Sequence, residues 1–538
     1  MPARKAQETA GRPSPKSKTV EFRRWRGVNL TDARTDIEDE EFFWLENAVT
    51  VGKGSAQIVP GPGAAVATLA QGIATLWGFV LNGAAVMIAV GKDGSLTQVT
   101  PGGATTVIRG AGTVSTAAHL AIWQSSPILI LDPQFGYMSW DGVTFTVISA
   151  TQKGNGLAVF EGRVWLFLNR TITVTSPNTF NDFNPANGST SAIITDEAFP
   201  GNVNALVSAL EQLWTFGQAA VDAIANVVAS GAPPNVVTTF SITNIVTNIG
   251  TNAPNSVIGY LRALTFLAPF GVYALSGVTP QKLSEKLDQM FPALTLTGDV
   301  PAAVGIVQSL PCLVFLVTYT QALAPSLPIP ANGVTTGTQL LLCFTQGKWF
   351  FATQGPRLQL LAPPEQPPPP TIMGPGPTWI TTVIVNGVSQ IWATDGTVIY
   401  QCFGGTPADN VPGKIVSKFY SFGPSTTMKQ ALKAGFEYQA SRPIPNAVLT
   451  IDSNLRQEPV AIAQGNVINF TNTGGGVIQF LNAAGQPINF VAQGLVLTRT
   501  LSNVFGHYLG WTYTFNDPPH RVQAVQLEYV PSVDWRRT

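Results

Sequence analysis

The densest group of residues that could do chemistry lies near the N-terminus, in GVNLTDARTDIEDEEFFWLENAV at residues 27–49. Its carboxylates could bind a metal ion, transfer protons or begin a helix. A calcium loop needs a glycine at its sharp turn, and none follows Asp36 at the required place. A helix needs less, because Asp36 or Asp39 can cap the free amides of the first turn, where further acids are also favourable. The stretch therefore predicts a short helix over residues 40–49. Its apolar face, turned toward a partner surface, would consist of Phe42, Phe43, Leu45 and Ala48.

The rest of the chain offers little material for catalysis. It has three histidines and no phosphate-binding loop, paired C-x-x-C, H-E-x-x-H or G-x-S-x-G motif. No nucleophile or orienting acid stands near His520 in NDPPHRV, so we expect this histidine to hydrogen-bond within its turn and not to act as a general base. Four carboxylates could supply the pair that a glycosidase holds about 5–9.5 Å apart, but nothing in the sequence brings two of them together, and the repeated Asp-box of sialidases is absent. These carboxylates are Asp132, Asp141, Glu161 and Asp196.

The three cysteines stand far apart inside the apolar runs PCLVFLV, LLLCF and YQCF. Cys312, Cys343 and Cys402 are therefore expected to be buried small hydrophobic residues, not a disulfide framework or a zinc site. No apolar run reaches the length of about 18 uninterrupted residues that a membrane-spanning helix requires. We thus expect no catalytic residue, no cofactor, no metal site and no membrane span, and we predict that the protein is not an enzyme.

The composition points to assembly. Charged residues make up 11% of the 538 residues, against about a quarter in an ordinary soluble domain. A surface so poor in charge is either covered by uncharged polar groups or buried in subunit contacts. Basic and acidic residues balance at 30 each, but residues 1–26 carry eight basic and two acidic residues. This basic arm is expected to be disordered alone and to order against a neighbouring subunit or against phosphates.

From about residue 70 onward, short apolar runs alternate with glycine-containing turns, as in GLAVFEGRVWLFLNRTITVT. Glycine supplies the positive φ of tight hairpin turns, so each pair of runs predicts a β-hairpin. The units recur at about forty to fifty residues, near the spacing of propeller blades, and six to seven fit between residues 65 and 405. A two-sheet sandwich would show similar spacing, but radial repetition better protects the edges of so many short strands. Equivalent places in the blades are predicted for Trp165, Trp214, Tyr273, Trp349 and Tyr400.

The pattern changes after about residue 410, where seven or so alternating strands in some 125 residues suit one β-sandwich. A proline-rich stretch at residues 361–378 predicts an extended connector between strand pairs. We therefore predict an all-β protein whose main part is a β-propeller of six to seven blades. Its predicted parts are a basic flexible arm (1–26), a segment with a short helix and a strand (27–64), the propeller (65–408) and a β-sandwich-like domain (409–538).

The N-terminal stretch also resembles a family. Residues 26–48 read as a basic residue, Gly-Val-Asn-Leu, polar residues and an acidic stretch that ends in Glu-Asn-Ala, followed by IVPGPGAAV. This order is similar to the tail accessory, or nozzle, proteins of short-tailed bacteriophages, which stabilise packaged DNA. LWTFGQAAVDAIANV, the Ser284 to Asp288 segment and the closing QLEYVPSVDW resemble the same family. The basic arm is longer than the family pattern, and the proline-rich stretch has no counterpart in it.

The resemblance implies a structural virion protein, assembled in the host cytoplasm and located in the tail. Such propeller subunits form a ring, expected to be sixfold, below the portal and the head-to-tail adaptor protein. The ring extends the channel and retains or guides the genome during ejection. The implied partners are further copies of the chain, the adaptor, tail fibre or tailspike proteins, and double-stranded DNA that passes without sequence specificity.

A channel wall rich in Lys and Arg would hold DNA through its phosphates, so we expect channel loops with few basic residues. The basic arm is expected to serve subunit or adaptor contacts. The alternative is a propeller-type tail protein that binds or cleaves glycans. The predicted assembly contacts are Arg23, Arg24, Trp25, Arg26, Phe42 and Phe43.

Overall fold

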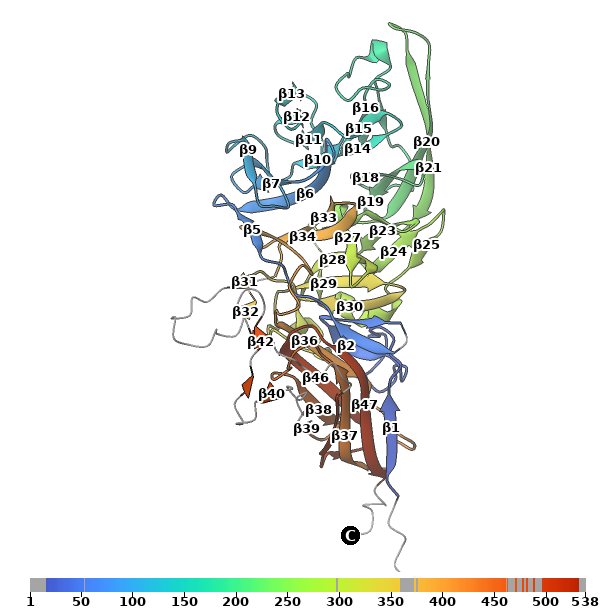
Figure 1. Ribbon diagram of the computed structural model, residues 1–538. Helices are drawn as coiled ribbons and strands as arrows, with labels where there is room; N and C mark the ends of the chain where they lie inside the picture. Colours follow the sequence, from blue (N-terminus) through green and yellow to red (C-terminus); the bar gives the residue numbers. More distant parts are fainter. Residues whose placement is uncertain are drawn as a thin grey trace, which may run out of the picture.

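The computed structural model describes residues 16–52, 54–296, 299–358, 372–373, 376–460, 462, 470–471, 477–478, 480–481, 487–488 and 496–531. Figure 1 shows an elongated molecule built almost wholly of strands, with a ring of sheets in its upper part and a two-sheet unit in its lower part. Residues 1–15 and most of the proline-rich stretch, 361–371 and 374–375, lie outside the described residues.

The upper part is a seven-bladed β-propeller, as the hairpin spacing predicts. In six blades the strands follow one another in the chain and pair antiparallel with their neighbours. The first blade consists of β6 (Ile73–Leu81), β7 (Ala84–Gly91), β8 (Leu96–Val99) and β9 (Thr105–Arg109), the second of β10 (His119–Ile122), β11 (Ile128–Asp132), β12 (Gly136–Trp140) and β13 (Phe145–Ser149). The third consists of β14 (Gly156–Phe160), β15 (Arg163–Leu168), β16 (Thr171–Val174) and β17 (Thr190–Ile193), the fourth of β18 (Val203–Ala209), β19 (Gln212–Gly217), β20 (Ala220–Ser230) and β21 (Val237–Thr247). The fifth consists of β22 (Ile258–Tyr260), β23 (Ala263–Ala268), β24 (Gly271–Leu275) and β25 (Pro280–Lys282), the sixth of β27 (Ala302–Val307), β28 (Leu310–Tyr319), β29 (Thr338–Thr345) and β30 (Lys348–Ala352).

The seventh blade closes the ring. It joins β33 (Trp379–Val385), β34 (Val388–Thr394) and β35 (Val398–Gln401) to β5 (Ala65–Thr68), which comes from the start of the ring and pairs antiparallel with β35. The first strands of most neighbouring blades lie side by side, including β33 against β6. Separate apolar clusters fill the spaces between blades. Joining the first and last strands in one sheet leaves no free edge between blades, which stabilises the closed ring.

Glycine at the turns behaves as the sequence predicts. The pairs Asn82-Gly83 and Glu161-Gly162 connect consecutive strands with both residues at positive φ, 51° and 81° for the first pair and 52° and 62° for the second. This is the geometry of the type I′ hairpin turn, which matches the twist of the flanking strands. The local turn chemistry thus fixes the hairpins of the blades.

The lower part is a β-sandwich. One sheet has the order β3 (Ala48–Val51), β4 (Ser55–Ile58), β47 (Arg521–Pro531), β37 (Lys429–Gln439) and β44 (Val496–Leu501), with β1 (Lys18–Phe22) on β47 and β45 (Phe505–Gly506) on β37. The other contains β2 (Phe42–Glu46), β36 (Val411–Ser417), β46 (Leu509–Asp517), β38 (Val448–Ser453) and β39 (Gln457–Val460). Aromatic side chains from the two sheets meet between them, with the ring centroids of Phe436 and Tyr513 4.7 Å apart. The sandwich-like domain is therefore confirmed, but part of it comes from the N-terminal segment.

Propeller and sandwich share one sheet. Strand β2 pairs in parallel with β30 of the sixth blade and antiparallel with β36. The shared sheet begins at β26 (Leu294–Thr295) and runs through the blade into the sandwich. The remaining elements are short: β31 (Arg357–Leu358), β32 (Ile372–Met373), β40 (Phe470–Thr471), β41 (Val477–Ile478), β42 (Phe480–Leu481), β43 (Pro487–Ile488), and the 3-10 helices η1 (Pro185–Asn187), η2 (Pro254–Ser256), η3 (Glu285–Ala293) and η4 (Gln321–Leu323).

The predicted helix over residues 40–49 is wrong. Residues 42–46 form β2 and residues 48–51 form β3, with Asn47 at a φ of 54° between them. All five side chains of β2 are buried, because the strand lies inside the shared sheet with neighbours on both edges and both faces. A helix of this length would bury one face and expose Glu46. Tertiary packing therefore overrides the capping signals.

The basic arm is not wholly disordered in the part that the structure describes. Residues 18–22 form β1, which pairs antiparallel with β47 from Lys18 opposite Tyr529 to Phe22 opposite Val525. Phe22 is buried and its ring lies 4.4 Å from that of Tyr420. The arm therefore adds a strand to its own chain's sandwich.

The five aromatic residues expected at equivalent blade positions do not all correspond. Trp165 and Trp214 do: each is the third residue of its blade's second strand, and each indole donates to a carbonyl five residues earlier, at 3.2 and 2.8 Å. Tyr273 and Tyr400 lie on third strands, and Trp349 lies on a fourth. A short hydrophobic-aromatic pattern next to a turn does not specify which hairpin of a blade it belongs to.

Candidate anion-binding site

The predicted assembly residues divide into a buried and an exposed set. Trp25, Phe42 and Phe43 are buried in this chain's own core. The Trp25 ring lies 5.5 Å from Phe42 and 6.1 Å from Trp511 of the sandwich. The exposed members are the arginines Arg23, Arg24 and Arg26.

Two of these arginines hold the N-terminal segment in place. Arg23 pairs with Glu437 at 2.8 Å, and the Glu437 side chain is only 3% exposed. Arg26 contacts Glu38 at 2.6 Å and Glu40 at 3.2 Å. Arg24, by contrast, has no acidic partner among the described residues, so its charge is available to a ligand.

The Glu-Asn-Ala end of the acidic stretch forms a buried polar joint. Glu46 accepts hydrogen bonds from the Trp44 indole at 3.0 Å and from the backbone N–H of Ala331 at 2.8 Å. Burial raises the pKa of Glu46 above its ordinary value. The Asn47 amide donates to Thr353 at 2.7 Å and to the Pro412 carbonyl at 2.6 Å, which connects the end of the sixth blade to strand β36 of the sandwich.

Gly27 is required because two segments of the chain approach each other closely here. A Cβ atom at this position would lie 2.9 Å from the Lys348 Cβ and from the backbone of Trp349. Real Cβ atoms do not come so close, so the N-terminal segment can cross β30 here only if residue 27 is a glycine. The next residue, Val28, donates its N–H to the Trp349 carbonyl at 3.0 Å. This crossing forms the floor of a pocket.

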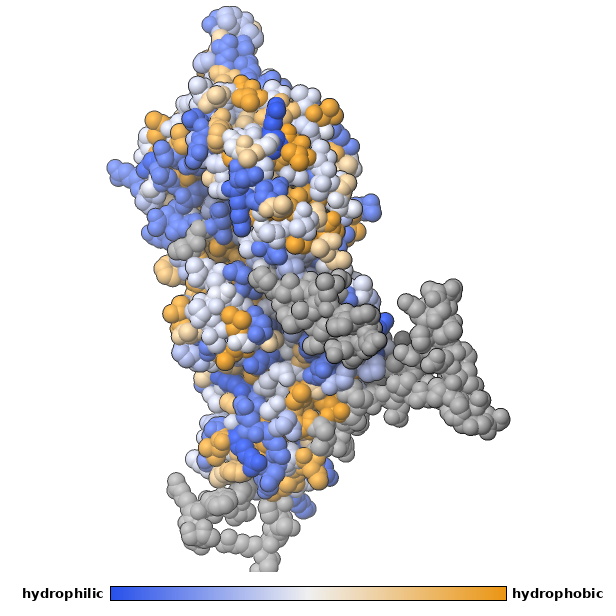
Figure 2. Space-filling model, turned by 90° about the vertical axis from the view of Figure 1, so that its left-hand side faces the viewer, coloured by the Kyte–Doolittle hydropathy of each residue, from blue (hydrophilic) through white to orange (hydrophobic). Residues whose placement is uncertain are grey.

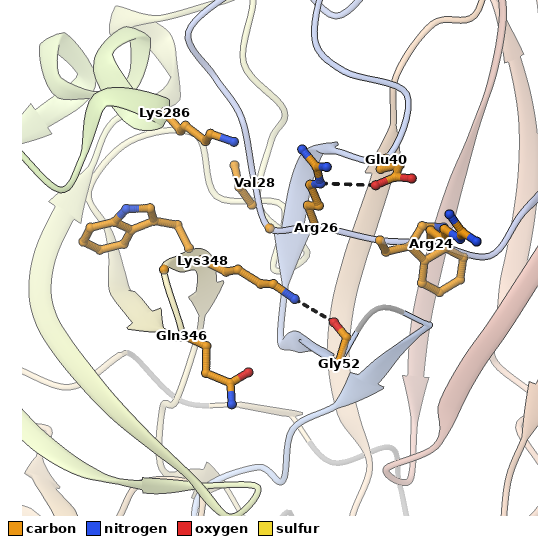
Figure 3. A pocket seen from close by; sticks show the side chains of 12 residues that line it. Arg24, Arg26, Val28, Glu40, Gly52, Lys286, Gln346 and Lys348 are labelled. Atoms are coloured by element: carbon orange, nitrogen blue, oxygen red, sulfur yellow. Dashed lines mark hydrogen bonds and ion pairs between the residues drawn. The ribbon is translucent and has the colours of Figure 1, made fainter.

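The pocket has a volume of about 540 Å³ and lies between the N-terminal segment, the 3-10 helix η3 and the turn between β29 and β30. Four cationic side chains line it together with one acid, Glu40. In Figure 3 the ends of Lys286 and Arg26 lie on one side of the hollow and the end of Lys348 on the other. The cations are Arg24, Arg26, Lys286 and Lys348.

Lys348 shows that positive charge is in excess here. Its ammonium group donates to the Gly52 carbonyl at 2.8 Å, and it has no acidic partner among the described residues. Burial, with the nearby Arg26 as the second cause, lowers the pKa of Lys348 below its ordinary value. A bound anion would offset the burial of the Lys348 charge and its repulsion from Arg26, so the arrangement is suited to hold an anion.

The four carboxylates considered for glycoside cleavage are used by their own turns or stand apart. Asp132 accepts from the backbone N–H groups of Ser115, Gln134 and Phe135 at 2.6 to 2.9 Å. Asp141 accepts two turn amides, which lower its pKa, and Asp196 accepts one. Among the described residues no hydrogen bond joins any two of the four.

His520 bonds within its own turn and the three cysteines are buried, as the sequence predicts. His520 is buried, its Nδ1 donates to the Pro518 carbonyl at 2.8 Å and its Nε2 accepts from the Tyr513 hydroxyl at 2.7 Å. Burial lowers the pKa of His520 to about 4. Cys312, Cys343 and Cys402 are free and buried. Within the described ranges, no group of three or more His, Cys, Asp or Glu side chains is placed to hold a metal ion, and no helix is long and apolar enough to cross a membrane.

Sequence reasoning did not identify Lys286 and Lys348 as members of the site. They stand more than 250 residues from Arg24 in the chain, and only the crossing at Gly27 brings them beside it. The available signal was the glycine in the GVNL stretch, since a glycine that no turn requires marks a close backbone approach. The partner of that approach cannot be read from one sequence.

No protein-family model and no curated protein matches this chain. Solved structures give distant likenesses. The extracellular domain of the putative one component system BT4673 from B. thetaiotaomicron has 8% identity and a TM-score of 0.37, and the match covers 66% of this chain and 41% of that chain. The WD40 β-propeller domain of Doa1 has 11% identity and a TM-score of 0.35 over 64% of this chain and 97% of that one. U3-55K has 11% identity and a TM-score of 0.35 over 62% and 96%. These TM-scores are too low to support an argument, and the propeller assignment rests on this chain's own strand pairing.

Proposed function

We propose that this chain is a structural subunit of a short bacteriophage tail, a nozzle protein whose copies form a ring that extends the DNA channel below the portal and the adaptor. The resemblance of residues 26–48 to nozzle proteins supports the phage assignment. The closed propeller joined to a sandwich by one continuous sheet supports a mechanical role, because such a subunit transmits load without a hinge between its parts.

The observation that carries the ring proposal is the uncharged hairpin of β20 and β21. Residues 223–261 contain no Asp, Glu, Lys, Arg or His. The two strands have 11 residues each, and their outer ends are largely exposed. Figure 1 shows this hairpin rising along and beyond the propeller. Exposed strands normally carry charges that prevent pairing with other chains, so this hairpin fits a contact with a neighbouring copy.

The surface of the propeller agrees with contacts of this kind. Figure 2 shows apolar and polar residues interspersed over the visible face. Exposed apolar side chains of the hairpin include Val228 and Val237, at 54% and 57% of their full exposure. In the assembled ring these groups would be covered, while the scarcity of cations would let DNA pass without adhesion.

The molar mass of the purified chain in solution tests the proposal. Light scattering should give a ring of about six copies, either for the chain alone or after addition of the portal-proximal tail proteins. A chain that remains monomeric in both conditions would overturn the nozzle assignment.

The arginines need separate variants in this assay. Arg23→Ala removes the partner of a buried carboxylate, so it lowers stability as well as any assembly contact. Arg24→Ala leaves all described ion pairs intact. We expect Arg24→Ala to fold as the wild type and to weaken adaptor docking, measured as the adaptor concentration that gives half-maximal complex. Unchanged docking would rule out a role of Arg24 in that contact.

A further inference from the structure

We propose that the pocket lined by Arg24, Arg26, Lys286 and Lys348 is a binding site for a phosphate group. It is a site of the single chain, so it stands independently of ring formation. Its volume of about 540 Å³ lies within the range of roughly 300–1,000 Å³ that is usual for small-ligand sites. It therefore holds a phosphate and part of the group that carries it.

The charge count favours an anionic ligand. Two of the four cations are already matched: Arg26 pairs with Glu38 and Glu40, and Lys286 pairs with Glu41, whose side chain is 1% exposed. Arg24 and Lys348 remain without acidic partners among the described residues. Arg26 faces two carboxylates, so the four cations are balanced by three acids, Glu38, Glu40 and Glu41, which leaves a net charge of +1. This excess favours an anion such as a phosphate group.

The placement of the donors also favours phosphate over carboxylate. A carboxylate is planar and takes its strongest contacts from one forked donor, whereas phosphate accepts hydrogen bonds around a tetrahedron. The cations here come from three separate segments, and in Figure 3 the ends of Arg26 and Lys286 lie on the side opposite the end of Lys348. The Gln346 amide at the rim adds a neutral donor.

The crossing at Gly27 fixes the geometry of the site. Val28 is held to Trp349 by a backbone hydrogen bond, and Trp349 is fixed in turn by its indole N–H, which donates to the Leu283 carbonyl at 2.9 Å. The backbone of Lys348 is thus held in place by its neighbour Trp349, which is bonded on both sides. Lys348 is therefore preorganised, and little ordering of this donor is needed when an anion binds.

Inorganic phosphate is the first probe, titrated by calorimetry into the full-length chain at low and constant ionic strength. We expect saturable binding at one site per chain. The double variant Arg24→Gln/Lys348→Gln should weaken it by at least about ten-fold, because each change removes a charge-assisted hydrogen bond. The matched control is Lys153→Gln/Arg262→Gln, which removes two exposed cations elsewhere on the propeller and should bind as the wild type does.

Two nucleoside probes distinguish the source of the phosphate. Thymidine 5′-monophosphate binding more tightly than inorganic phosphate would assign the site to the end of a nucleic acid strand, and equal affinity would assign it to free phosphate. Thymidine without phosphate should not bind. The proposal is overturned if the wild type shows no saturable phosphate binding, or if the Arg24/Lys348 double variant, with an unchanged melting temperature, still binds as tightly as the wild type.

Discussion

Glu46 is an acid whose environment opposes its charge. It is fully buried at the joint of propeller and sandwich, and burial raises its pKa. The folded chain therefore keeps the proton on the Glu46 carboxyl group to a higher pH than the unfolded chain, which loses it near the ordinary glutamate pKa of 4.5. The stability gained from this proton is fully present below that pH and is lost as the pH rises through the folded-state pKa.

Glu46→Gln should remove this pH dependence, because its carboxamide can accept from Trp44 and donate to Thr353 without titrating. Between pH 5 and pH 8 the wild type should lose stability relative to the variant, by about 1.4 kcal/mol for each unit of pKa elevation. Urea unfolding at both pH values measures this. The matched control is Glu197→Gln, an exposed acid. Equal pH responses of the wild type and Glu46→Gln would show that Glu46 does not titrate in this range.

At the scale of elements, local signals predicted the blades, and long-range pairing decided the rest. The hairpins between residues 70 and 400 follow from alternating apolar runs and Gly turns, which act within about ten residues. Strand β2 was misread as a helix because its partners, β30 and β36, lie some 300 to 370 residues away. The anion site depends on the same distant pairing and is not predicted from the sequence, although two of its four cations, Arg24 and Arg26, are predicted assembly contacts.

The hairpin of β20 and β21 gives a prediction at this scale. Replacing Val228–Thr239 by Asn-Gly keeps Val227 and Phe240, whose ring lies 5.1 Å from that of Trp165, and removes only the outer part. No residue in the removed stretch is fully buried, but Thr238 accepts a hydrogen bond from the buried Arg163 at 3.0 Å. The melting temperature should therefore fall by about 5 °C, without loss of the fold. Ring formation should be lost, as measured by light scattering.

A full-length variant, Val228→Lys with Val237→Lys, tests whether ring formation depends on the uncharged surface of the hairpin or on its length. It keeps the hairpin and adds two charges, which should weaken association by repulsion between neighbouring copies. Rings of wild-type stability in both variants would show that the hairpin makes no subunit contact.

At the scale of the whole molecule, propeller and sandwich form one structural unit. They share a sheet through β2, and the Trp44 ring lies 4.5 Å from Phe351 of the blade and 5.7 Å from Tyr319. One continuous apolar cluster extends from the fifth, sixth and seventh blades into the sandwich. Neither part can therefore unfold without exposing the buried side of the other.

We expect a single calorimetric unfolding transition for the full chain, with calorimetric and van't Hoff enthalpies that agree. The fragment 65–408 lacks β2, so it exposes the edge of β30 and the rings of Phe351 and Tyr319. It should melt well below the full chain or aggregate, although it contains every strand of the seven blades. Two separated transitions in the full chain, one of them at the melting temperature of the fragment, would instead show that the propeller is stable alone and that the shared sheet is only a connection.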